Sequence, residues 1–113
     1  MKKIEAIIRP EKFEEVRDAL ESVGYPGITV TEVVGHGKQK GITRQWRGKE
    51  YKVSLLPKMK LEIVVPSKEA DKIVKAVLSA AKTGKVGDGK VFVYTIDEAY
   101  KVSSGEEGDK TVS

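Results

Sequence analysis

The sequence predicts a single α+β domain in which a strand followed by a helix occurs twice. Three observations support this prediction. Apolar residues alternate over two separate segments, each of these segments stops at a proline, and an apolar pattern of helical spacing follows each proline. With 113 residues, the chain is long enough for one hydrophobic core but short for two domains.

The first unit begins at the N-terminus. Its strand is predicted by the alternating residues Ile4, Ala6 and Ile8. Pro10 ends this strand and suits the first turn of a helix. The apolar residues of that helix are Phe13, Val16, Leu20 and Val23. Gly24 ends the helix, and a further strand is expected over residues 28–34.

The second unit repeats the pattern. Its strand is predicted by Met59, Leu61, Ile63 and Val65. Pro66 ends the strand, and Ser67 is placed to cap the following helix. The apolar stripe of this helix consists of Ala70, Ile73, Val74, Val77 and Ala81. Thr83 and Gly84 end it, and the last strand is expected over residues 91–96.

Together the two units give the order βαββαβ, which is the ferredoxin-like arrangement with an antiparallel sheet and both helices on one face. Ile7 and Val64 lie on the opposite face, so that face is not fully polar. We expect another subunit to bury it, although single exposed aliphatic residues are also common on protein surfaces.

Composition narrows the class of protein. The chain has no cysteine, which excludes a disulfide framework and a thiolate metal site. Its N-terminus lacks the apolar region of a signal peptide, and no apolar run is long enough to cross a bilayer. We therefore expect a cytoplasmic protein.

The segment from residue 35 to residue 55 shows no pattern that predicts a helix or a strand. Loops of this length in small domains are usually functional or disordered. Residues 36–60 contain eight Lys or Arg residues and a single acidic residue, Glu50. This segment is therefore far more basic than the rest of the chain. Trp46 beside Arg47 suits a protein interface, although Trp46 packing on the core is the alternative.

A second loop is unusually rich in glycine. It reads Thr83-Gly84-Lys85-Val86-Gly87-Asp88-Gly89-Lys90. Glycines let backbone N–H groups converge on an anion, and the two lysines add positive charge. The spacing fits G-x-x-x-x-G-K, but Val91 replaces the hydroxyl residue of a P-loop, and a helix precedes the loop rather than following it. We exclude a P-loop, and a phosphate cradle and a plain turn both stay open.

No catalytic set is apparent. His36 is the single histidine, and no group of histidines and carboxylates has the spacing of metal ligands. The acidic pairs lie on a predicted helix surface and in the C-terminal segment, where solvation explains them. The sequence therefore predicts a protein that is not an enzyme.

The two loops together closely resemble those of the PII nitrogen-regulatory signal proteins. The similar segments are Gly35-His36-Gly37-Lys38-Gln39-Lys40-Gly41, Arg47-Gly48-Lys49-Glu50-Tyr51, Leu56-Pro57-Lys58 and the glycine-rich loop. The resemblance covers roughly residues 1–100 as a single domain. It leaves residues 101–113 as a C-terminal segment with a flexible tail.

The resemblance implies a homotrimer with a T-loop over about residues 37–55 and a B-loop over about residues 82–90. It implies ATP or ADP in clefts between neighbouring subunits, with Mg²⁺ and 2-oxoglutarate. The nucleotide-site residues that it implies are Ile7, Thr29, Gly35, Gly37, Lys38, Gln39, Glu62, Val64, Gly87, Asp88, Gly89, Lys90, Lys101 and Ser103. Those implied for 2-oxoglutarate are Gln39, Lys40, Gly41 and Lys58, and Gln39 would also ligate Mg²⁺.

The resemblance further implies that Trp46, Arg47 and Tyr51 contact a partner. Tyr51 stands at the position that is uridylylated in other members. The implied partner is an ammonium transporter or an enzyme of nitrogen metabolism, so contact with a membrane would be indirect. No nucleic-acid partner is implied.

In the implied nucleotide site, this sequence departs from the family at two positions. Lys101 and Ser103 stand where the family usually has arginines that reach the nucleotide phosphates. Lysine lacks the bidentate fork of arginine, and serine carries no charge. We therefore expect weaker or less ATP-selective binding than in a typical member.

Two other functions compete with this one. A nucleic-acid-binding ferredoxin-like module needs exposed aromatic residues on the central strands, where this sequence has Glu5, Ile7, Glu62 and Val64. A small phosphate-handling enzyme needs a base or a nucleophile, and the sequence offers no convincing candidate.

Overall fold

The computed structural model describes residues 1–35, 42–46, 49–53 and 55–112. Its strands are β1 (Lys2–Ile8), β2 (Thr29–Gly35), β3 (Ile42–Trp46), β4 (Lys49–Val53), β5 (Leu56–Val65) and β6 (Gly89–Thr95). Its helices are α1 (Phe13–Ser22) and α2 (Ala70–Ala81), with short 3₁₀ turns at Pro10–Lys12, Ser67–Glu69 and Asp109–Thr111.

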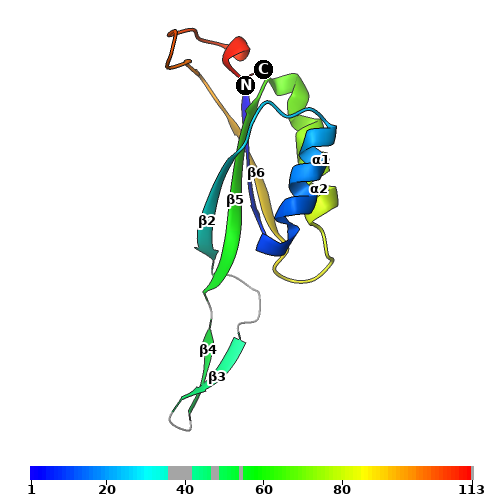
Figure 1. The fold of residues 1–113 in the computed structure, drawn as a ribbon, viewed down its shortest axis with the longest axis vertical. Helices are drawn as coiled ribbons and strands as arrows, with labels where there is room; N and C mark the ends of the chain where they lie inside the picture. The colour runs from blue at the N-terminus through cyan, green and yellow to red at the C-terminus, as the bar shows by residue number, and fades with distance from the viewer. Residues whose placement is uncertain (36–41, 47–48, 54, 113) are drawn as a thin grey trace.

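The main sheet has the strand order β2-β5-β1-β6, and all of its neighbouring strands pair antiparallel. Both helices pack on one face of this sheet (Figure 1). The two central strands, β1 and β5, are therefore the strands that precede the helices, as the repeated unit predicts. The ferredoxin-like fold is confirmed.

The hydrophobic core lies between this sheet face and the helices. It is formed by the alternating residues of β1 and β5 and by the apolar stripes of α1 and α2. The largest fully buried side chains are Ile4, Ile8, Leu20, Leu61, Ile63, Ile73, Val16, Val65 and Val77. These positions are those that the sequence pattern assigns to the core, because alternation and helical spacing each place one face inward.

The residues that begin and end the helices are those expected from the sequence, except at Ser67. Pro10 opens a 3₁₀ turn that runs into α1, and Gly24 follows the end of α1 with a φ of +74°. Ser67 was predicted to cap the second helix, and this is wrong. A 3₁₀ turn starts at Ser67 itself, and its hydroxyl oxygen accepts a hydrogen bond from the Met1 amino group at 3.1 Å.

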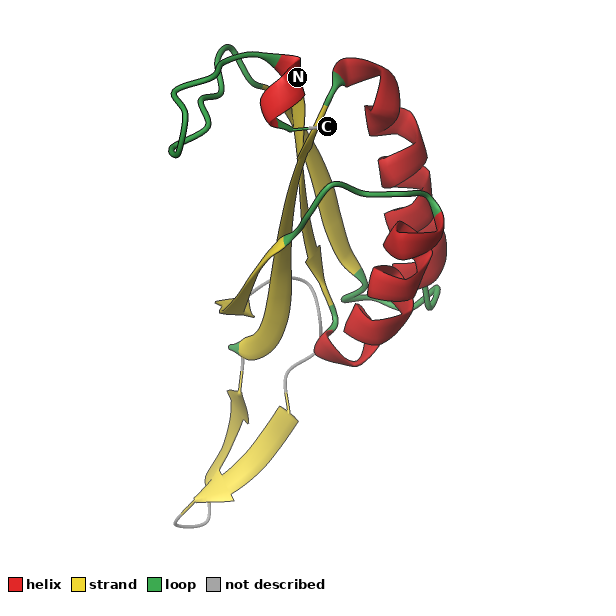
Figure 2. Cartoon of the chain, turned by 45° about the horizontal axis from the view of Figure 1, so that its top comes forward, coloured by secondary structure: helices red, strands yellow, loops and turns green. Residues whose placement is uncertain are grey.

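The basic segment contains an antiparallel hairpin that the sequence did not predict. Strands β3 and β4 form a separate two-stranded sheet in which Ile42 pairs with Val53 and Trp46 pairs with Lys49. The hairpin projects beyond the end of the main sheet (Figures 1 and 2). It gives the molecule an extent of 61 Å along its longest axis, against 27 Å and 20 Å across.

The C-terminal segment folds back near the N-terminus. The Ile96 N–H donates to the Met1 carbonyl at 3.0 Å, which places the end of β6 beside the start of β1. Tyr100 then forms a bridge with Glu107, and the Lys101 N–H donates to the Glu106 carbonyl at 2.7 Å. Residues 101–112 thus form hydrogen-bonded turns at the end of the sheet where the chain begins.

Candidate anion-binding site at the glycine-rich loop

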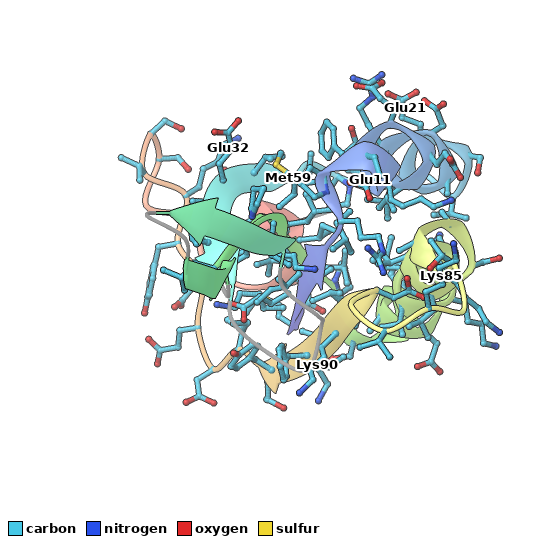
Figure 3. The ribbon with its side chains drawn as sticks, turned by 90° about the horizontal axis from the view of Figure 1, so that it is seen from below. Glu11, Glu21, Glu32, Met59, Lys85 and Lys90 are labelled. Atoms are coloured by element: carbon cyan, nitrogen blue, oxygen red, sulfur yellow. The ribbon has the colours of Figure 1, made fainter. Side chains whose placement is uncertain are left out.

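The B-loop, residues 82–90, connects α2 to β6. Gly89 pairs with Ile8, so the loop lies where β1 ends and where β2 leads into the basic segment. Figure 3 looks onto this end of the molecule and shows Lys85 on the helix side and Lys90 on the side of the sheet away from the helices. Both lysines are exposed.

The three glycines of the B-loop all have backbone conformations that favour glycine. The φ angles are +86° at Gly84, +99° at Gly87 and +108° at Gly89. At Gly89 there is also no space, because an added Cβ would lie 1.7 Å from the Ile7 carbonyl oxygen. The glycines therefore set the course of the loop, whether or not an anion is bound.

The Asp88 carboxylate holds the two ends of the loop together. Its Oδ2 accepts hydrogen bonds from the backbone N–H groups of Thr83 at 2.8 Å and Gly84 at 2.9 Å. Its Oδ1 accepts one from the Thr83 hydroxyl and one from Arg9 Nε, the latter at 3.1 Å. These bonds, with those of Thr83 first in weight, hold the pKa of Asp88 well below its usual range. We call Arg9, Thr83, Gly84 and Asp88 the Arg9–Asp88 clasp.

Two cations also bind the loop through its carbonyl groups. Arg9 Nη2 donates to the Val86 carbonyl at 2.7 Å, and Lys58 Nζ donates to the Gly87 carbonyl at 2.8 Å. Partial burial and then the neighbouring positive charge of Arg9 lower the pKa of Lys58. The loop thus rests on two adjacent positive side chains that come from the ends of β1 and β5.

Several predicted nucleotide-site residues do lie at this end of the sheet. Lys90 pairs with Ile7 across β6 and β1, which puts both on the face away from the helices. Gly35 lies against Lys58, since a Cβ on Gly35 would meet the Lys58 Cγ at 3.0 Å. These residues and the B-loop surround one end of the open sheet face.

Other predicted residues lie further away. Thr29 pairs with Glu62, and Val64 pairs with Lys3, so these residues share the open face but lie towards the opposite end of the sheet. Lys101 and Ser103 follow β6 beyond that opposite end and are exposed. One subunit therefore does not bring Lys101 and Ser103 to its own B-loop.

The remaining predicted residues belong to the basic segment. Gly37, Lys38, Gln39, Lys40, Gly41 and Arg47 lie outside the described residues. The backbone of Trp46 lies in β3, and that of Tyr51 lies in β4, where Tyr51 pairs with Arg44. The structure thus places the two aromatic positions on the projecting hairpin.

Arg9 and Thr83 are two residues of the site that were not predicted to belong to it. Two signals were available for them. Arg9 directly follows Ile8, and pairing of the first and last strands brings that end to the B-loop. Thr83 opens the loop and is separated from Asp88 by four residues, a spacing that lets its backbone N–H and hydroxyl both reach the carboxylate.

The open face of the sheet does not have the character of an RNA-binding surface. Its central strands carry Glu5, Ile7, Glu62 and Val64, while its aromatic residues, Phe92 and Tyr94, lie on the edge strand β6. Among the residues that the structure describes, no three His, Cys, Asp or Glu side chains are grouped to hold a metal ion. None of the described helices has the length and apolarity needed to cross a membrane.

Comparison with known proteins agrees with this architecture. The family model described as "Nitrogen regulatory protein P-II" matches residues 1–106. The chain is 52% identical to the "Nitrogen regulatory protein P-II 2" of Methanothermobacter thermautotrophicus, over 99% of this chain and 97% of that protein. It is 51% identical to the "Nitrogen regulatory protein P-II 1" of Escherichia coli K12, over 99% of this chain and all of that protein.

Fold and relatives together define a regulatory protein and not an enzyme. The chain belongs to the nitrogen regulatory protein P-II family. A relative from Rhizobium etli, named "Nitrogen regulatory protein P-II", is 55% identical over 94% of this chain and 95% of its own length.

Proposed function

We propose that this protein senses ATP or ADP together with 2-oxoglutarate and regulates a target protein through the T-loop. The target is an ammonium transporter or an enzyme of nitrogen assimilation. The observation that carries the proposal is the B-loop, whose glycine backbone and supporting cations suit a phosphate group. In this proposal the protein acts in the cytoplasm by binding its ligands and its target, and it does not catalyse a reaction.

The local chemistry of the B-loop supports phosphate binding. The carbonyl groups of Val86 and Gly87 are engaged by Arg9 and Lys58, so they are not directed at an incoming anion. The Asp88 carboxylate is engaged by four donors within the fold. The N–H groups of Thr83, Gly84 and Lys85 are also used within the loop. What remains for a ligand is the N–H groups of Gly87 and Asp88 and the charge of Lys90, a combination typical of anion sites.

Assembly into a homotrimer is part of the proposal. Lys101 and Ser103 lie at the end of the sheet opposite to the B-loop, so they complete a nucleotide site only if they reach the B-loop of a neighbouring subunit. The open sheet face supports this assembly, because Phe92 and Tyr94 leave 42% and 43% of their surface exposed there.

Mg²⁺ and 2-oxoglutarate complete the proposed site. A divalent cation would offset the repulsion between a triphosphate and a dianionic acid, and Gln39 is the residue proposed to hold it. Lys58 lies at the B-loop and can pair with a carboxylate of 2-oxoglutarate. Lys40 and Gly41 would complete the contacts with that acid.

Calorimetry tests this proposal directly. Titration of ATP in the presence of Mg²⁺ is expected to show binding, and 2-oxoglutarate is expected to bind only when Mg²⁺ and ATP are present. Absence of ATP and ADP binding under all of these conditions would contradict the proposal. A pull-down from lysate with ATP plus 2-oxoglutarate, compared with ADP, would then identify the target.

The substitutions at positions 101 and 103 give a further expectation. A charge-assisted hydrogen bond to phosphate is worth about 1.5–3 kcal/mol. We expect K101R and S103R together to tighten ATP binding by at least about tenfold, which corresponds to about 1.4 kcal/mol. Val102→Arg adds the same charge between them and is the matched control, expected to change affinity less. Equal affinity of K101R/S103R and the natural protein would contradict this expectation.

A further inference from the structure

Arg9 binds the B-loop at two points from outside it. It directly follows β1, and its side chain is only 14% exposed. Nε donates to Asp88 Oδ1 at 3.1 Å, and Nη2 donates to the Val86 carbonyl at 2.7 Å. A single guanidinium group therefore fixes both the Asp88 side chain and the backbone two residues before it.

These contacts also fix the orientation of two peptide groups. In a planar trans peptide, the carbonyl of one residue and the N–H of the next point in opposite directions. The Val86 carbonyl faces Arg9, and the Gly87 carbonyl faces Lys58. The N–H groups of Gly87 and Asp88 therefore point away from these two cations, towards the side from which an anion can approach.

We propose that Arg9 is a positioning residue that holds the N–H groups of Gly87 and Asp88 in their anion-binding orientation through the Asp88 carboxylate and the Val86 carbonyl. This inference rests on the proposed function and deepens it, because it assigns the loop's shape to a residue outside the loop. The planar guanidinium donates in two directions from a rigid fork, whereas lysine supplies only a mobile point charge.

The alternative is that Arg9 acts by its charge alone. The variant Arg9→Lys distinguishes this alternative from a positioning role, because it keeps the charge and removes the guanidinium group. If Arg9 positions the loop, Arg9→Lys weakens Mg-ATP binding at least about tenfold, and Arg9→Met weakens it little further. Binding by Arg9→Lys equal to that of the natural protein would overturn the proposal. Arg17→Met is the matched control, because Arg17 pairs with Glu14 on α1, and we expect less than about a twofold change.

A double-mutant cycle with Asp88 tests the route of the effect. Asp88→Asn keeps the size of the side chain but replaces one acceptor oxygen with a donor group, so it disrupts the clasp. If Arg9 acts partly through Asp88, the loss of Mg-ATP affinity in the double variant R9M/D88N is smaller than the product of the two single losses, because the contact between them is lost in either single variant. Losses that multiply in the double variant would overturn this route.

A measurement without nucleotide keeps the two proposals distinguishable. The backbone N–H groups of Thr83 and Gly84 donate to Asp88, so their hydrogen exchange reports the clasp directly. We expect Arg9→Lys to accelerate exchange at both by about tenfold, a change that corresponds to about 1.4 kcal/mol. Unchanged exchange would overturn the role of Arg9. If the natural protein failed to bind Mg-ATP, the proposed function would fail, and exchange would still decide the role of Arg9.

Discussion

At the scale of single residues, Gly89 is a position of the B-loop that leaves no space for a side chain. Its Cα lies in β6 beside the Ile7 carbonyl oxygen, and an alanine Cβ there would lie 1.7 Å from that oxygen. The pairing of β1 with β6 must then open or shift, in addition to the strain of a φ of +108°. The constraint is therefore one of space as well as of backbone conformation.

We expect Gly89→Ala to lower the free energy of unfolding by roughly 3 kcal/mol. Gly84→Ala is the matched control, because Gly84 has a similar φ of +86° but open space around it. Its cost should be the conformational one alone, about 1–2 kcal/mol. Urea denaturation measures both, and equal losses in the two variants would contradict the steric argument.

The clasp also makes a prediction about pH. The pKa of Asp88 is lowered in the folded protein, chiefly by the Thr83 hydroxyl and N–H, and further by Arg9. A lowered folded-state pKa means that Asp88 stabilises the fold fully above its unfolded pKa of about 3.9. That contribution is lost as the pH falls from there through the lower folded-state pKa.

An NMR titration of the Asp88 carboxyl carbon would test this. We expect the carboxylate to remain largely ionised at about pH 3, below the ordinary pKa of about 3.9. Thr83→Val removes one donor while keeping the size and backbone N–H of the residue, and it should raise the pKa of Asp88 towards its ordinary value. A titration midpoint near the ordinary value in the natural protein would show that the clasp does not form in solution.

Residue roles were harder to predict from the sequence than residue positions. The glycines at 84, 87 and 89 indicated a loop with an unusual backbone, and each of them has a φ that favours glycine. Asp88 was predicted as part of the phosphate site, and its carboxylate in fact closes the loop from within. Arg9 was not predicted to belong to the site, because a single arginine after a strand forms no sequence motif. Only the pairing of β1 with β6 brings it to the loop.

At the scale of elements, the main sheet was predictable and the hairpin was not. Buried and less buried residues alternate from Ile4 to Ile8 in β1 and from Leu61 to Val65 in β5, and each strand is followed by a proline and a helix. Strands β3 and β4 have five residues each. The alternate residues of β3 are Ile42, Arg44 and Trp46, so apolar and charged residues share one face of the strand. Such short, mixed strands form through pairing with each other, which no single-strand pattern reveals.

We predict that the hairpin is dispensable for the stability of the domain. Strands β3 and β4 form a sheet of their own, and the buried side chains described above lie in β1, β5, α1 and α2. Replacing residues 42–53 with a short Gly-Ser linker should change the free energy of unfolding by less than about 1 kcal/mol, since loop length has a weak effect. In contrast, Leu61→Ala in the core should cost about 2–5 kcal/mol.

Denaturant unfolding of the two variants measures this difference. Loss of cooperative unfolding in the hairpin replacement would show that the hairpin supports the sheet. The same replacement should abolish binding of the target while leaving the fold intact, because the proposed partner contacts Trp46, Arg47 and Tyr51 all lie in it. If the variant without the hairpin still bound the target, the partner surface would lie outside the T-loop, and this prediction would be contradicted.

At the scale of the whole molecule, the open sheet face carries both charge and exposed apolar surface. Lys3 Nζ lies 3.3 Å from Glu62 Oε2 and 3.9 Å from Glu5 Oε1, so it separates two carboxylates that face each other across β1 and β5. The same ammonium group lies 4.6 Å from the centre of the Tyr94 ring. Lys60 Nζ also lies 3.9 Å from Glu62 Oε1, so the two lysines offset the charge of the two carboxylates in this cluster.

Strand β6 extends this surface to the edge of the sheet. Among the strands that the structure describes, it pairs with β1 alone, and its Phe92, Val93 and Tyr94 are all exposed in a single subunit. An exposed apolar edge strand invites pairing with another chain, and natural proteins usually cover one. The proposed trimer would cover it and would also bring the C-terminal segment of one subunit towards the B-loop of the next.

We therefore predict that the protein is trimeric in light scattering and that Phe92→Glu disrupts the trimer. Phe92 lies on the open face opposite Glu5, so a glutamate there would add a third carboxylate beside Glu5 and Glu62 at the buried surface. Leu78→Glu is the matched control, because Leu78 is exposed on α2, on the helix side of the sheet. It should remain trimeric. A monomeric natural protein, or dissociation of both variants alike, would contradict assembly through the open face. If Phe92→Glu is monomeric and folded, its affinity for Mg-ATP should fall as well, because the nucleotide site would then lack the neighbouring subunit.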